Sequence, residues 1–165
     1  MPPNKIYITP PAGLKLVWTG IFDMAEVYRR MKYWMDFNGY GTDFEEKEYI
    51  EIVKGDSKDL NIFWYGEKAK TGYFAYVIEI KFLILGLKKA EIQKDDRKIK
   101  LNNGYFEIRT TGYILSNYKN NFKSKSIQDI YEKFIVKKRI DEHKIQFYQK
   151  LYTFQDEIRS FLAMY

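Results

Sequence analysis

The fold of this chain is decided by one stretch, YFAYVIEIKFLIL, at residues 73–85. Side chains of a β-strand point alternately to opposite faces, so every second residue shares a face. One face of this stretch is wholly apolar and carries Phe74, Tyr76, Ile78, Ile80, Phe82 and Ile84. The opposite face includes Glu79 and Lys81, which tolerate water. The pattern predicts a long strand that buries one face of an antiparallel sheet.

Further β-structure is expected on both sides of this stretch, from about residue 44 to residue 115. Runs rich in Tyr, Phe, Ile and Val are separated there by turn residues, at Gly55-Asp56-Ser57, Gly72, Lys94-Asp95-Asp96 and Asn103-Gly104. Among these, Asn-Gly is the strongest hairpin signal. An earlier alternating stretch, 14–22, predicts one more strand. We therefore expect an antiparallel sheet of about five to seven strands.

Two helices are predicted to flank these strands. Asp23 followed by Glu26 three residues later is typical of a helix N-terminus, and Asn38-Gly39 supplies a stop. Ser126 and Asp129 repeat the N-terminal pattern, and the chain has no glycine or proline beyond Gly112. A helix over 126–163 would be about 57 Å long, which one small domain cannot cover. We expect it to break near residues 137–143, where its apolar stripe fades.

The order of strand, helix, antiparallel strands and long terminal helix resembles the helix-grip layout of the START and pollen-allergen-like proteins. This resemblance covers most of the chain by element order and carries no sequence motif. It implies an α+β fold in which the sheet wraps the terminal helix around a ligand cavity. No linker or repeat divides the sequence, so we expect a single domain over residues 1–165.

Two placements of the terminal helix predict two kinds of binding surface. If the helix grips the sheet, a gap beneath it is lined by Trp18, Tyr76, Ile78 and Ile108. If it packs flush, its second half leaves an apolar stripe for a partner protein or a second copy, formed by Tyr148, Leu151, Tyr152, Ile158 and Phe161. Aromatic side chains fill volume well and favour the flush placement. The primary expectation is a non-catalytic binding module for a partner protein or an apolar ligand.

Composition limits the chemistry and suggests an alternative function. The chain has no cysteine and one histidine, His143, which excludes disulfides and cysteine-based metal sites; we expect no cofactor and a histidine on the surface. Its net charge of +6 favours polyanions. The alternative is therefore a protein that binds RNA or a ribonucleoprotein through Arg109, Tyr113, Lys137, Lys138 and Arg139.

A third hypothesis is a metal-dependent nuclease. Glu79 and Lys81 on one strand face look like the E-x-K half of the restriction-endonuclease-like signature. That resemblance implies an upstream aspartate as a second metal ligand, either Asp56 or Asp59. The competing interpretation is a pair of cross-strand charge contacts of Glu79 and Lys81 with Glu107 and Arg109.

The sequence also indicates a compartment. Its first residues lack the basic and apolar regions of a secretory signal. The longest apolar stretch is interrupted by Glu79 and Lys81 and is too short to span a bilayer. We therefore expect a cytoplasmic protein with no membrane contact.

Overall fold

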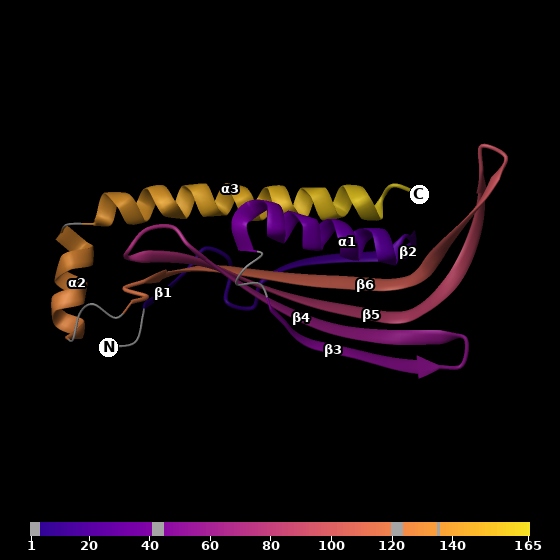
Figure 1. Cartoon of the computed structure of the whole chain (residues 1–165), viewed down its shortest axis with the longest axis horizontal. Coiled ribbons are helices and arrows are strands. Elements are labelled where there is room, and N and C mark those ends of the chain that lie inside the picture. The colour runs from indigo at the N-terminus through magenta and orange to yellow at the C-terminus, as the bar shows by residue number, and fades with distance from the viewer. Residues whose placement is uncertain (1–3, 41–44, 120–123, 135) are drawn as a thin grey trace.

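The chain folds into two layers, an antiparallel sheet with helices along one of its faces (Figure 1). The structure is a computed structural model, and it describes residues 4–40, 45–119, 124–134 and 136–165. The strands are β1 (Asn4–Tyr7), β2 (Leu14–Phe22), β3 (Glu45–Lys54), β4 (Ser57–Ala69), β5 (Phe74–Lys94) and β6 (Arg97–Ser116). The helices are α1 (Met24–Met35), the π-helical turn η1 (Asp36–Tyr40), α2 (Lys125–Phe134) and α3 (Lys137–Leu162). The predicted α+β class and strand number are confirmed.

The long hairpin of β5 and β6 forms the centre of the sheet. The strand order is β1-β6-β5-β4-β3. Both β1 and β2 pair with the remaining edge of β6, β1 with residues 113–116 and β2 with residues 102–110. Phe82 lies opposite Ile108, and both are buried. The apolar face predicted for residues 74–84 is therefore the face that the helices cover.

A bulge bends the hairpin between Leu85 and Lys88. Gly104 lies opposite this bulge, where an added Cβ would stand 3.2 Å from the Leu85 carbonyl oxygen. The hairpin turn predicted at Asn103-Gly104 is therefore wrong, because both residues lie inside β6. A glycine stands at position 104 because the backbone of β5 comes too close to leave room for a side chain. The true turn is at Asp95-Asp96, as the Lys94-Asp95-Asp96 signal predicts, and both aspartates have positive φ.

Helix α1 begins as the sequence predicts. The Asp23 carboxylate accepts a hydrogen bond of 3.1 Å from the backbone N–H of Glu26. Its inward face buries Met24, Val27, Met31, Trp34 and Met35 against the sheet. The regular helix ends at Met35, and η1 carries the chain to Gly39, which adopts a φ of 89° that favours glycine.

The terminal segment forms two helices. The predicted break exists, but it precedes Lys137 instead of falling within 137–143, and α2 begins one residue before Ser126. Figure 1 shows α3 running along the sheet beside α1, while α2 crosses the end of the sheet. None of the helices in the described part of the chain is long and apolar enough to cross a membrane.

Helix α3 packs flush on the sheet. Its inward face carries Phe147, Leu151, Phe154, Ile158 and Leu162, all buried. At Gly112 of β6, an added Cβ would stand 2.3 Å from Leu151 Cδ1. The backbone of the sheet and the side chains of α3 are thus in direct contact, with a glycine at this point of contact.

Candidate functional site: a groove between α1 and α3

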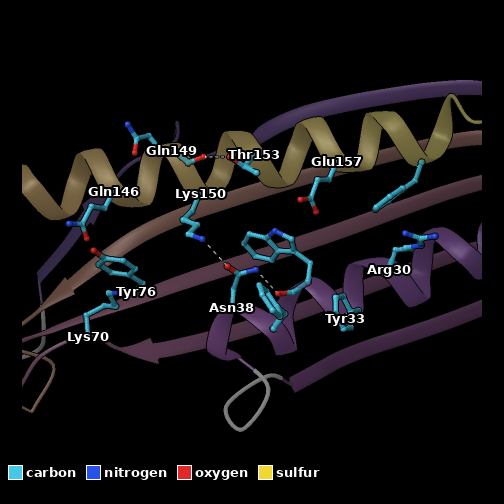
Figure 2. A pocket seen from close by; sticks show the side chains of 13 residues that line it. Arg30, Tyr33, Asn38, Lys70, Tyr76, Gln146, Gln149, Lys150, Thr153 and Glu157 are labelled. Carbon is cyan, nitrogen blue, oxygen red and sulfur yellow. Dashed lines mark hydrogen bonds between the residues drawn. The ribbon is translucent and has the colours of Figure 1, made fainter.

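A groove of about 780 Å³ runs between α1–η1 on one side and α3 on the other (Figure 2). The two helices are antiparallel, because Arg30 lies against Phe161 while Asn38 lies against Lys150. One face of α3 supplies one wall over about four turns. The lining residues are Arg30, Tyr33, Trp34, Phe37, Asn38, Lys70, Tyr76, Gln146, Gln149, Lys150, Thr153, Glu157 and Phe161.

Aromatic rings make up much of this lining. The buried Trp34 contacts Phe154 at a centroid distance of 4.5 Å and stacks on Tyr40. Tyr33 and Phe37, one helical turn apart, stack on each other at 5.8 Å and are both exposed. The groove therefore has a buried aromatic floor and an exposed aromatic rim, which suits an apolar or aromatic ligand body.

Three lysines lie towards one end of the groove, and two of them contact Asn38. Lys68 Nζ donates to the Asn38 backbone carbonyl at 2.7 Å, and Lys150 Nζ donates to Asn38 Oδ1 at 3.2 Å. The ammonium of Lys70 lies 5.3 Å from the centroid of the Tyr76 ring. Within the described residues, none of the three lysines forms an ion pair with a carboxylate.

These lysines repel one another. Burial, followed by the charges of Lys70 and Lys150, lowers the pKa of Lys68 from its ordinary value. A cluster of like charges that has no counter-ion in the described part of the chain favours an anion, which would relieve the repulsion. This end of the groove is therefore suited to a carboxylate or phosphate.

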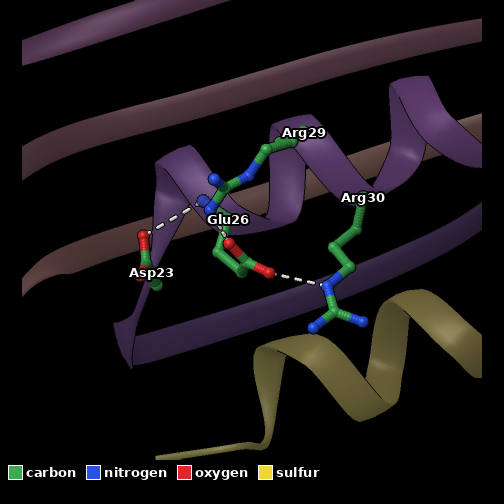
Figure 3. A network of polar contacts seen from close by, with 4 residues as sticks. All are labelled: Asp23, Glu26, Arg29 and Arg30. Carbon is green, nitrogen blue, oxygen red and sulfur yellow. Dashed lines mark hydrogen bonds and ion pairs between the residues drawn. The ribbon is translucent and has the colours of Figure 1, made fainter.

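At the opposite end of the groove, Arg30 already has an acidic partner. Arg30 Nε lies 2.6 Å from Glu26 Oε1, and the same carboxylate binds Arg29 (Figure 3). The Arg30 guanidinium also lies over the ring of Phe161 at 5.0 Å, and the acidic Glu157, one helical turn before Phe161, lines the same groove. Positive charge is thus concentrated at the lysine end.

Tyr76 is held at the lysine end by His143. The Tyr76 hydroxyl and His143 Nδ1 are 2.6 Å apart, and the imidazole packs on Phe74 at a centroid distance of 5.0 Å. Burial, followed by the charge of Lys70, lowers the pKa of His143, and burial raises the pKa of Tyr76 to about 12. The predicted surface position of His143 is wrong, because the ring is partly buried between α3 and β5.

The predicted cavity residues are only partly brought together. Tyr76 lines the groove, but Ile78 and Ile108 are fully buried in the core and do not. Trp18 is partly buried on β2, where its indole N–H donates to the Ile21 carbonyl at 3.3 Å. The gap predicted beneath the terminal helix is therefore wrong for these three residues, because α3 packs flush and the hollow lies at its side.

The predicted partner stripe is also divided. Leu151 and Ile158 are 0% and 1% exposed, so their expected exposure is wrong. They share the inward face of α3, and the molecule's own sheet covers them. Tyr148 and Tyr152 are exposed, with ring centroids 4.4 Å apart, whereas Phe161 is partly buried beside the groove. A role for the two tyrosines in partner binding stays a prediction.

The residues predicted to bind nucleic acid lie on two separate surfaces. Arg109 alternates with buried residues of β6 and points away from the helices, and Tyr113 on the same strand is itself buried, at 3% exposed, whereas the basic run 137–139 starts α3. Tyr113 donates a hydrogen bond of 3.0 Å to Glu79, and Arg109 lies 3.6 Å from Glu107. The predicted binding surface is therefore not assembled, and its β6 members already have acidic partners.

The carboxylates of the nuclease hypothesis are also dispersed. Glu79 faces Tyr65 of β4, six positions from Asp59, which corresponds to about 20 Å along a strand. Asp59 accepts a hydrogen bond from the Gly86 N–H and pairs with Lys54, both at 2.8 Å. No group of three metal-binding side chains occurs among the residues that the structure places.

The competing interpretation of that strand also needs correction. Glu79 is opposite Thr111 and Lys81 is opposite Arg109, so neither forms the predicted cross-strand pair of unlike charges. Instead, Lys81 lies over the ring of Phe63 at 5.5 Å. The strand register, which a single strand's sequence does not specify, decides these contacts.

The sequence contains no signal that predicts the lysine end of the groove. Asn38, Lys68, Lys70 and Lys150 come from η1, β4, the turn after it and α3. No local motif joins them, since Asn38 and Lys150 are 112 positions apart.

Comparison of the chain with protein-family models, curated proteins and solved structures finds no match.

Proposed function

We propose that this protein is a non-catalytic binding module whose groove between α1 and α3 holds an amphipathic anion. The apolar or aromatic body of the ligand lies along the rings of Trp34, Tyr33 and Phe37. Its carboxylate or phosphate lies at the lysine end, near Lys70 and Lys150. The observation that carries the proposal is this pair of ammonium groups, which have no carboxylate partner among the described residues and lie with Lys68 at one end of an aromatic groove.

The dimensions of the groove support a small ligand. Its volume of about 780 Å³ is within the range of about 300–1,000 Å³ typical of small-molecule sites. Along α3, the lining residues run from Gln146 to Phe161, which corresponds to about 22 Å of helix. An elongated molecule with one charged end matches this shape and the uneven distribution of charge.

A calorimetric titration with two probes tests the proposal. Dodecanoate and 1-dodecanol share an alkyl chain and differ in the charge of the head group. Dodecanoate is expected to bind more tightly, because only its carboxylate meets the lysines. Equal affinities for the two probes would contradict the assignment of the lysine end to an anion.

Single substitutions locate the charge. Lys70→Met and Lys150→Met are each expected to weaken dodecanoate binding by about two- to fivefold, as for a partly exposed ion pair, and to leave 1-dodecanol binding unchanged. Lys98→Met, an equal charge change on the exposed tip of the β5–β6 hairpin, serves as the control. If Lys98→Met weakened dodecanoate binding as much, the effect would belong to net charge and not to the groove.

A further inference from the structure

Strand β3 forms an exposed edge of the sheet. In the described part of the chain its partner is β4 alone, so one side of its backbone is unpaired. A bulge between Glu46 and Glu48 interrupts the strand near its start. From Glu48 to Lys54 the strand is regular and contains no proline, which leaves seven residues available for pairing.

This regular edge is unusually apolar. Tyr49, Ile50, Ile52 and Val53 are 48%, 44%, 52% and 69% exposed. Natural edge strands are commonly protected by lysine, proline or bulges that prevent pairing with another chain. Here the bulge lies outside the apolar segment, and the one lysine within it, Lys54, stands at its end. The edge is therefore open to a further strand.

The hairpin fixes which backbone groups face outward. Residues Gly55-Asp56 form a two-residue turn, so Lys54 and Ser57 close the hairpin as a hydrogen-bonded pair. Hydrogen-bonded and non-hydrogen-bonded pairs alternate along an antiparallel ladder. The N–H and C=O groups of Tyr49, Glu51 and Val53 consequently point away from β4 and are free to pair.

We propose that the β3 edge pairs with the β3 edge of a second copy of this chain, antiparallel and with Glu51 on the two-fold axis. This register uses all three outward-facing residues, since Tyr49 meets the partner copy's Val53 and the two Glu51 residues meet each other. On the opposite face of the sheet, Ile50 meets Ile52 of the other copy. The four apolar side chains of each edge are thereby matched with apolar side chains.

Charge supports the same register. Glu48 stands opposite Lys54 of the other copy, at both ends of the paired segment. The two central carboxylates do not oppose the pairing, because Glu51 Oε1 already lies 2.9 Å from Lys58 Nζ within each copy. A shift of two residues would place Glu48 opposite Ile52, which loses the Glu48–Lys54 contact. The pairing extends the sheet and leaves the α1–α3 groove open, so it is independent of ligand binding.

Cysteine cross-linking tests the register directly, because the natural chain contains no cysteine. Residues directly opposite in an antiparallel pair have Cα atoms about 4.5–5.5 Å apart, within disulfide reach. Under mild oxidation Glu51→Cys is therefore expected to form a disulfide-linked dimer. Ile50→Cys and Ile52→Cys are each expected to stay unlinked alone, since their copies are diagonal neighbours, and to link when mixed.

Sedimentation equilibrium provides the second measurement. An interface of one strand pair predicts weak self-association, visible between about 10 and about 500 µM. Ile52→Lys is expected to abolish it, whereas Ile145→Lys, on the exposed side of α3, is expected to leave it intact. Three outcomes would overturn the proposal: a monomer throughout this range, linkage of Ile50→Cys alone, or dissociation caused by Ile145→Lys.

Discussion

The partial burial of His143 makes the stability of the fold sensitive to pH. The pKa of His143 is lowered in the folded chain, mainly by burial. Below about pH 6.5 the unfolded chain therefore binds more protons at this residue, and stability rises with pH through this range. Equivalently, the stabilisation is complete above that pH and is lost as the pH falls towards and through the lowered pKa.

We predict that the free energy of unfolding of the natural protein decreases between about pH 7 and about pH 5.5. A His143→Gln variant, which retains polar atoms but does not titrate, should show a smaller slope over the same range. Urea unfolding at several pH values measures both slopes. Parallel slopes in the two proteins would show that His143 does not control this dependence.

The contact of α3 with the sheet at Gly112 gives a second prediction at the scale of residues. A Cβ at position 112 would overlap Leu151 Cδ1 at 2.3 Å, so Gly112→Ala should destabilise the fold by about 1–3 kcal/mol through overpacking. Leu151→Ala alone should cost about 2–5 kcal/mol, because it leaves a cavity.

The double variant distinguishes this mechanism from a general loss of stability. Gly112→Ala with Leu151→Ala should be less destabilised than the sum of the single variants, since the added methyl enters the vacated space. Denaturant unfolding of the four proteins measures the difference. Strict additivity would mean that the two positions do not compete for the same volume.

At the scale of elements, a carboxylate fastens α2 to the end of the sheet. Glu132 accepts hydrogen bonds from Ser116 at 2.5 Å, Tyr73 at 2.7 Å and Gln128 at 3.1 Å. Burial opposes ionisation of Glu132, but these donors outweigh it, and the net effect lowers its pKa. The carboxylate therefore contributes stability above its unfolded-state pKa that is lost as the pH falls through the lowered, folded-state value.

We predict that Glu132→Ala releases α2 and leaves the rest of the fold in place. Hydrogen exchange should quicken for the amides of α2, while those of β5 and β6 stay protected. Asp129→Ala, a loss of one exposed carboxylate on the same helix, is the matched control. Faster exchange throughout the sheet would show that Glu132 supports the whole fold and not this one element.

The terminal helices show what a pattern of apolar residues does and does not predict. The excessive length of an unbroken helix correctly indicated a break, but residues 137–143, where the stripe fades, lie within α3. The expected exposure of Leu151 and Ile158 was wrong for a related reason. A stripe tells which residues share a face of a helix, but it does not tell whether the molecule's own sheet covers that face.

For the whole molecule, alternation over residues 73–85 and the turn residues were sufficient to predict an antiparallel sheet with helices on one face. Strand register was not predictable in the same way, and Lys81 consequently faces Arg109 in place of an acidic partner. The lysine end of the groove also depends on contacts between distant segments, since Lys68 and Lys150 both donate hydrogen bonds to Asn38. Such a site becomes visible only once η1, β4 and α3 are placed together.

The most direct test of the proposed groove is a nuclear magnetic resonance titration of the isotope-labelled chain with dodecanoate. We predict that shift changes concentrate along the groove, at Asn38, Lys70 and residues 146–161. In the Lys70→Met/Lys150→Met double variant, the same changes should require about tenfold more dodecanoate, since two charge contacts are lost. Shift changes confined to the outer face of the sheet, around Arg109 and Tyr113, or none at saturating dodecanoate, would contradict the account.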